Sequence, residues 1–207
     1  MASAQRVRWR LALWIAVASN APFLLANWWC VTGLGGWEMP WSDLLLMPFI
    51  LAILWLPIAC VAVFFGRRRE EAAICALVVG LFVPTAAFSG AGRMLAFLWA
   101  GERAQPIADA VAEYRRQVGT LPQRLEDLVP VYLPSLPTRI PPLRVQQGSG
   151  VYDGADPGHA VPWSLVASVS SGVVNFDLFF YEPGENYPNA APGGSVQRLG
   201  RWAYYHE

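Results

Sequence analysis

The chain has 207 residues, of which 55% are apolar and only 14% are charged. Ordinary soluble domains are about 45–50% apolar, so this composition indicates a protein that is partly embedded in a membrane. Its 15 basic and 15 acidic residues cancel, and residues 102–207 hold eight arginines against eleven acidic residues. Because nucleic-acid phosphates require a concentrated basic surface, nucleic acid is excluded as a partner.

Three apolar segments in the first half are predicted to be transmembrane helices. They cover residues 11–29, 44–65 and 72–88, and the third extends to residue 100 in its longer form. A helix needs about 20 apolar residues to cross a bilayer. We therefore expect a transmembrane region at residues 1–100 and a separate domain at 101–207, with the lipid bilayer as one partner.

Clusters of arginine predict the orientation of these helices. Three arginines precede the first segment and three follow the second, whereas the loop at residues 32–42 has none. Arginine-rich loops stay in the cytoplasm, so we expect a bacterial inner-membrane protein with a cytoplasmic N-terminus and a periplasmic C-terminal domain. A signal peptide cleaved at Ala16-Val17-Ala18 is the alternative. The apolar run continues to Trp29, which favours an uncleaved helix.

Arginine and tryptophan side chains at the segment ends are expected to lie at the membrane interface. An indole is amphipathic, and a long arginine stem can carry its charge out to the headgroups. If the third helix continues, Arg93 lies roughly 30 Å beyond Ala72, near the outer surface. The predicted interface residues are Arg67, Arg68, Arg69, Arg93 and Trp99.

Residues 106–118 are predicted to form an amphipathic helix that begins the second half. Pro106 suits its first turn, and Gly119 suits the residue just past its end. One face carries apolar side chains at helical spacing and needs a surface to lie against. This stripe consists of Ile107, Val111, Tyr114 and Val118.

A short helix and an extended segment are predicted to follow. Pro122 suits the start of the short helix, which turns Leu125 and Leu128 inward and ends at Pro130. Residues 132–137, YLPSLP, are too rich in proline for regular structure. We expect them to run extended across the preceding helices.

Three β-strands are predicted in residues 163–170, 174–181 and 199–205, with Ser171-Gly172 as a tight turn between the first two. The expected apolar faces are Trp163, Leu165, Ala167 and Val169, and Val174, Phe176, Leu178 and Phe180. A sheet with one apolar face needs a cover, which the helical stripe supplies. The expected fold is therefore a membrane anchor of three helices joined to a small α+β domain, in which a helix packs on a three-stranded antiparallel sheet.

The linker motifs of this region carry a family resemblance. YRRQVG at residues 114–119, LP at 121–122, LEDLV at 125–129 and YLPSLP at 132–137 resemble the helix-to-linker region of type IV pilin-like proteins. The similarity is closest to the major pseudopilins of type II secretion. It implies a long helix on a small antiparallel sheet. The leader-peptidase site of that family, a glycine followed by an apolar run with glutamate five residues on, has no match here.

Two acidic loops are candidate calcium sites. Residues 153–159 and 182–189 place carboxylates on turns, and calcium prefers such oxygen ligands. Major pseudopilins bind calcium in a loop of their sheet region, so the resemblance implies calcium here too. Asp, Asn and Gly also make turns without a metal. The candidate ligands are Asp153, Asp156, Glu182 and Glu185.

The sequence shows no catalytic motif. Only two histidines occur, and neither belongs to a recognisable nucleophile arrangement, zinc spacing or phosphate loop. We predict neither an enzyme nor a resident cofactor.

The aromatic tail at residues 198–207 is expected to be the last strand; an exposed Trp202 and Tyr204 would instead form a partner-binding patch.

The function predicted from these features is that of a membrane-anchored, non-catalytic interaction or assembly module of the bacterial envelope. The pseudopilin resemblance points to secretion or pilus machinery, with an envelope protein as partner. One alternative is an immunity protein that captures an envelope-acting toxin. Another is an accessory subunit of a membrane enzyme or transporter.

Overall fold

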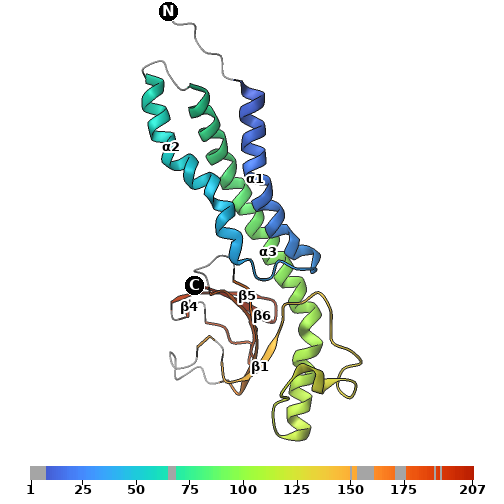
Figure 1. Cartoon of the computed structure of the whole chain (residues 1–207). Helices are drawn as coiled ribbons and strands as arrows, with labels where there is room; N and C mark the ends of the chain where they lie inside the picture. Colours follow the sequence, from blue (N-terminus) through green and yellow to red (C-terminus); the bar gives the residue numbers. More distant parts are fainter. Residues whose placement is uncertain are drawn as a thin grey trace, which may run out of the picture. The chain divides into compact units, whose positions relative to one another are not determined.

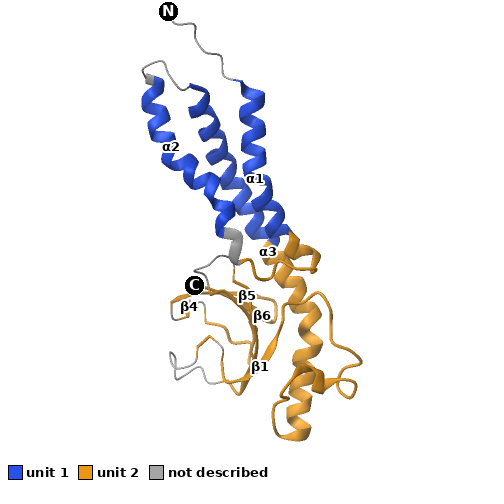
Figure 2. Ribbon diagram, in the orientation of Figure 1, with its two compact units in different colours: residues 1–28, 41–92 blue, residues 29–40, 93–207 orange. Residues whose placement is uncertain are grey.

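A computed structural model describes residues 8–64, 69–149, 151–152, 161–170, 176–188, 190–191 and 193–207. The chain forms two compact units (Figure 2). Unit 1 comprises residues 1–28 and 41–92, and unit 2 comprises residues 29–40 and 93–207. The expected boundary was residue 100. The units instead divide at residue 92, and the segment that links the first two long helices belongs to unit 2.

Three long helices dominate the first half (Figure 1): α1 (Trp9–Thr32), α2 (Met47–Phe64) and α3 (Arg69–Val118). All three are long and apolar enough to cross a membrane, as the apolar segments predicted. A short 3₁₀ helix, η1 (Pro40–Leu46), precedes α2. The chain is therefore consistent with a multi-pass membrane protein.

Within unit 1, α1 and α3 approach each other closely near Gly92. A Cβ atom at Gly92 would lie 2.7 Å from Cε2 of Trp28, so a glycine is needed at this contact. The indole nitrogen of Trp28 donates a hydrogen bond to the carbonyl oxygen of Phe88, 3.1 Å away. The same contact therefore satisfies a polar group in an apolar region.

The separate helix predicted at residues 106–118 is the last part of the continuous helix α3. The prediction that Pro106 starts a helix is wrong, because Pro106 lies inside it. An interior proline removes one backbone hydrogen bond. Here the surrounding sequence is rich in alanine, the best helix former. In addition, Ala104 and Ile107 are fully buried in the core of unit 2, which holds this turn in place.

The sheet of unit 2 has six antiparallel strands in the order β1-β2-β3-β6-β5-β4, not the expected three. The strands are β1 (Arg144–Gln147), β2 (Trp163–Ser168), β3 (Leu178–Tyr181), β4 (Ala190–Ala191), β5 (Gly194–Leu199) and β6 (Trp202–His206). The additional strands β1, β4 and β5 are short or largely polar, so their sequences carry a weak alternation signal. The strand predicted at residues 199–205 contains a turn at Gly200, whose φ is +68°. It is therefore the end of β5 followed by β6.

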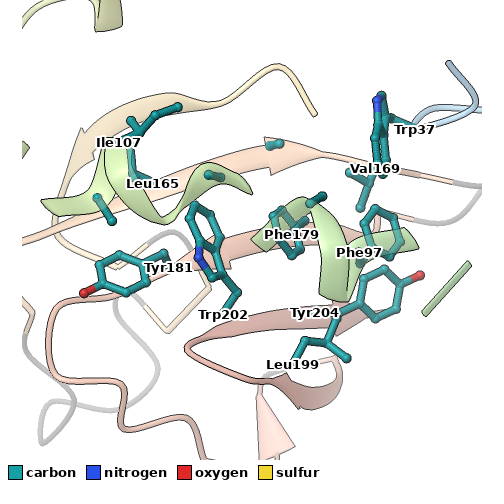
Figure 3. Close-up of a cluster of buried hydrophobic side chains, with 14 of the residues drawn as sticks. Trp37, Phe97, Ile107, Leu165, Val169, Phe179, Tyr181, Leu199, Trp202 and Tyr204 are labelled. Atoms are coloured by element: carbon teal, nitrogen blue, oxygen red, sulfur yellow. The ribbon is translucent and has the colours of Figure 1, made fainter. Parts of the chain in front are cut away.

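Both faces of the sheet are buried. One face packs on α3 in the main core, shown in Figure 3; the other face forms a second apolar cluster. The predicted inward face of β2 is confirmed by Leu165 and Ala167. The prediction for β3 is wrong, because Phe179 faces the helix and Phe180 packs on the opposite face. Phe176 is 64% exposed, and Ser171-Gly172 lies outside the described residues.

A ridge of small residues lets α3 lie close to the sheet. Its buried members follow one another four residues apart, on one helix face: Ala96, Ala100, Ala104 and Ala108. The predicted stripe is confirmed at Ile107 and Val111, which are fully buried, but Val118 is 51% exposed. The sheet therefore covers the middle of α3 and not its last turn.

The linker after α3 follows the prediction except at its start, because the short helix begins at Leu125 and not near Pro122. The short helix is the 3₁₀ helix η2 (Leu125–Leu128), in which Leu128 is fully buried. Residues 132–137 have no regular structure. The rings of Tyr132 and Tyr114 meet edge to face with centroids 5.3 Å apart, which holds this segment against α3.

Candidate functional site

Helix α3 and the β5–β6 turn of unit 2 frame an open pocket of about 390 Å³. This volume is in the range of ligand-binding clefts, about 300–1,000 Å³. We refer to it as the helix–hairpin pocket. Its lining residues are Leu98, Gly101, Glu102 and Gln105 from α3, and Leu199, Gly200, Arg201 and Trp202 from the turn.

Two glycines give the pocket its shape. Gly200, with φ +68°, allows the two-residue turn that pairs Leu199 with Trp202. Gly101 allows the indole of Trp202 to lie against α3, because a Cβ at residue 101 would be 2.9 Å from its Cδ1 atom. The indole nitrogen donates to Oε1 of Gln105 at 3.2 Å. The floor of the pocket is thus mainly apolar, and its indole is fixed to α3 by this contact and hydrogen bond.

The rim of the pocket carries charges that mostly pair with one another. Nε of Arg201 lies 2.5 Å from Oε1 of Glu185, and its Nη1 lies 3.5 Å from Oδ1 of Asp109. The hydrogen bond to Glu185 is the main cause that raises the pKa of Arg201. Arg198 also reaches Glu185, at 3.4 Å. In the described part of the chain, Glu102 is the one charged lining residue without such a partner.

Arg93 lies in a polar site of unit 2 that the sequence did not reveal. Its side chain is 4% exposed. Nη1 donates to the carbonyl oxygen of Gly36 at 3.1 Å, and Nη2 donates to those of Trp37, at 3.0 Å, and Val169. Its guanidinium lies 5.0 Å from the ring centroid of Phe97. The charge of Arg93 is therefore bonded inside the protein, whereas an arginine that reached out to the headgroups would be exposed.

A second buried polar group lies in the same unit. The carboxylate of Asp177 is fully buried and accepts a hydrogen bond from the hydroxyl of Tyr204 at 2.7 Å. Nδ1 of His206 lies 2.7 Å from its other oxygen. Burial and the bond to Asp177 together raise the pKa of Tyr204. This cluster fixes the end of β6 to the β2–β3 connection.

Of the two acidic loops predicted to bind calcium, the structure describes the carboxylates of only one. Glu182 is fully buried, and Oγ of Ser149 donates to its carboxylate at 2.5 Å. Glu185 pairs with Arg201. Asp153 and Asp156 lie outside the described residues. Among the described residues, no three His, Cys, Asp or Glu side chains are arranged to hold a metal ion.

The predicted contact patch on the last strand is not at the surface. Trp202 is 1% exposed and Tyr204 is 7% exposed, so the prediction that they form an exposed partner-binding patch is wrong. Their rings extend the aromatic row of the main core in Figure 3, in which Phe179 stacks on Trp202 at 4.8 Å. Trp202 can contact a partner only where its side chain lines the helix–hairpin pocket.

The remaining predicted interface residues are only partly described. Trp99 is 38% exposed and Arg69 is exposed, whereas Arg67 and Arg68 lie outside the described residues.

Comparison of the chain with protein-family models, curated proteins and solved structures found no match. The geometry of unit 2 is therefore the basis for a functional argument.

Proposed function

We propose that the chain is a multi-pass protein of a bacterial inner membrane that presents unit 2 to the periplasm as a non-catalytic module binding another envelope protein. The three long apolar helices support the membrane location. The helix-on-sheet arrangement of unit 2 supports a pseudopilin-like domain. The arginine clusters of the sequence support the orientation.

Packing within unit 2 supports one part of this topology independently of charge, namely that the interhelical segment and the sheet lie on the same side of the membrane. The segment at residues 29–40 lies between α1 and α2, yet it belongs to one compact unit with residues 93–207. Its Met39 amide donates to the carbonyl oxygen of Ser170 at 2.9 Å, and Arg93 holds Gly36 and Trp37. A segment can pack in this way only if it is on the same side of the bilayer as the sheet.

The helix–hairpin pocket is the observation that carries the binding function. Buried aromatic or aliphatic anchors in well-formed pockets dominate the free energy of protein–protein association. The pocket offers an apolar floor at Leu98, Leu199 and Trp202, with polar groups at its rim. It therefore fits an apolar side chain that a partner presents at its surface.

In-cell photo-crosslinking tests this proposal. A photoreactive amino acid placed at Glu102 or Arg201, both of which line the pocket, should form one discrete adduct. The same amino acid at Gln197, an exposed residue of the neighbouring strand β5, is the control and should not form it. Capture of a secretion or pilus subunit would support assembly, and capture of a toxin would support the immunity alternative. Equal labelling at all three positions would contradict a binding role for the pocket.

A further inference from the structure

The charge at the pocket rim indicates what kind of segment binds there. Arg201 is neutralised by Glu185 and Asp109. Glu102 also lines the pocket, is exposed, and has no hydrogen bond or ion pair among the described residues. The charge beside the apolar floor that has no ion-pair partner among the described residues is therefore negative.

Resting on the proposed function, we propose that the helix–hairpin pocket binds a peptide segment in which a large apolar residue is followed by a basic one. The apolar side chain lies over Leu98, Leu199 and Trp202, and the basic side chain pairs with the carboxylate of Glu102. Electrostatic complementarity of this kind sets specificity more than affinity. An acidic segment would meet Glu102 with a like charge and bind less well.

The position of Glu102 makes this pairing geometrically direct. Glu102 lies one residue after Gly101, whose missing side chain brings Trp202 against the helix. It precedes Gln105 by one helical turn, and Gln105 accepts the hydrogen bond of the Trp202 indole. The free carboxylate therefore lies on the same short stretch of α3 that contacts Trp202 of the apolar floor.

Titration of the full-length protein in phosphatidylcholine nanodiscs tests the proposal. The ten tryptophans are labelled with 5-fluorotryptophan, and the Trp202 fluorine resonance is assigned with Trp202→Phe. The probes are the acetylated dipeptide amides phenylalanyl-arginine, phenylalanyl-glutamate and phenylalanyl-leucine. We expect the first to shift the Trp202 resonance saturably and to bind several-fold more tightly than the other two.

Variants separate the two parts of the site. Glu102→Gln should weaken binding of the arginine peptide by about fivefold, as loss of one exposed ion pair permits, and leave the leucine peptide unchanged. Glu126→Gln, the same charge change on η2, is the matched control and should have no effect. Leu98→Trp should fill the pocket and abolish binding, whereas Val118→Trp, at an exposed position of α3, should not.

The outcomes distinguish this inference from the proposed function. If all three peptides shift Trp202 with equal affinity, the pocket binds apolar groups and the inferred charge selectivity is wrong. If the glutamate peptide binds best, the inferred chemistry is also overturned. If no peptide shifts Trp202 while crosslinks from Glu102 still form, the module binds a partner but not through this segment. If neither is observed, both proposals fail.

Discussion

Nη2 of Arg93 donates a hydrogen bond to the carbonyl oxygen of Trp37, 3.0 Å away. The two residues are far apart in sequence, and Trp37 belongs to the segment between the first two long helices. The same guanidinium also bonds Gly36 and Val169. One buried cation therefore ties together three parts of unit 2: α3, the interhelical segment and the end of β2.

Replacing Arg93 should be strongly destabilising. Arg93→Met keeps the length of the side chain but leaves the carbonyl oxygens of Gly36, Trp37 and Val169 without their donor. Unsatisfied buried polar groups cost about 1–3 kcal/mol each, so loss of the donor to these three carbonyl oxygens should lower the free energy of unfolding of unit 2 by about 3 kcal/mol or more. Near-UV circular dichroism during denaturation in detergent measures the loss. Arg115→Met, at an exposed position of α3, is the control, and an equal loss there would contradict the buried role of Arg93.

Gly101 should not tolerate a side chain. Gly101→Ala would place a Cβ atom 2.9 Å from Cδ1 of Trp202, and overpacking of this kind typically costs about 1–3 kcal/mol. Gly80→Ala is the matched control, because no atom lies within 4 Å of that position and alanine is the better helix former. Lower thermal stability of unit 2 in the first variant only is the expected result. If both variants were equally stable, the contact with Trp202 would be looser than described.

The sequence was sufficient for features that depend on local pattern. The spacing of Ile107 and Val111 predicted a buried helical face, and both are fully buried. The faces of β3 could not be assigned, because Phe179 and Phe180 are both buried, one on each side of the sheet. When both faces of a strand are apolar, alternation carries no information about its direction.

Features that depend on distant residues could not be predicted. In the sequence, Arg93 is a charge at the end of an apolar segment. No pattern near it predicts that it donates hydrogen bonds to Gly36 and Val169. The helix–hairpin pocket exists because Gly101 and Trp202 meet across almost half of the chain. Such contacts are set by tertiary packing, which local periodicity does not encode.

The hydrogen bond from Tyr204 to Asp177 should contribute more than an exposed one. Tyr204→Phe removes a donor from a fully buried carboxylate, and hydrogen bonds to charged groups are worth about 1.5–3 kcal/mol. Tyr132→Phe is the comparison, because its hydroxyl bonds Gln117 at an exposed site; there we expect a loss below about 0.5 kcal/mol. Denaturation of the two variants side by side measures both values. Equal losses would show that burial of Asp177 does not strengthen its bond.

Unit 2 should lose stability at alkaline pH through Tyr152. Burial, and then the carboxylate of Glu182, raise the pKa of Tyr152 to about 12, whereas an unfolded tyrosine has a pKa of about 10. The folded form therefore retains the proton of Tyr152 to a higher pH than the unfolded form. The contribution of this proton to the free energy of unfolding is fully present below pH 10 and is lost as the pH rises through 12. A difference of two pKa units corresponds to about 2.7 kcal/mol, and solvent screening makes the expected loss in free energy of unfolding smaller than this.

Tyr152→Phe isolates this contribution. The variant should be slightly less stable than the wild type at pH 8, because the hydroxyl of Tyr152 donates to the carbonyl oxygen of Pro188 at 2.9 Å. Between pH 10 and 12 its stability should fall less steeply, because it has no proton to lose at this position. Chemical denaturation of both proteins at a series of pH values across this range provides the measurement. Parallel slopes for the two proteins would show that Tyr152 ionises equally in both states.

The proposed topology predicts that two sites far apart in sequence react from the same side of the membrane. Leu34, in the interhelical segment, is 74% exposed, and Gln197, on β5, is also exposed. In a background free of the three native cysteines, Leu34→Cys and Gln197→Cys should both react with a membrane-impermeant maleimide added to intact spheroplasts. Because residues 29–40 and 93–207 form one unit, labelling of only one site would contradict that packing. Protection of both until the membrane is permeabilised would preserve the packing but reverse the proposed orientation, and the periplasmic binding role would fail with it.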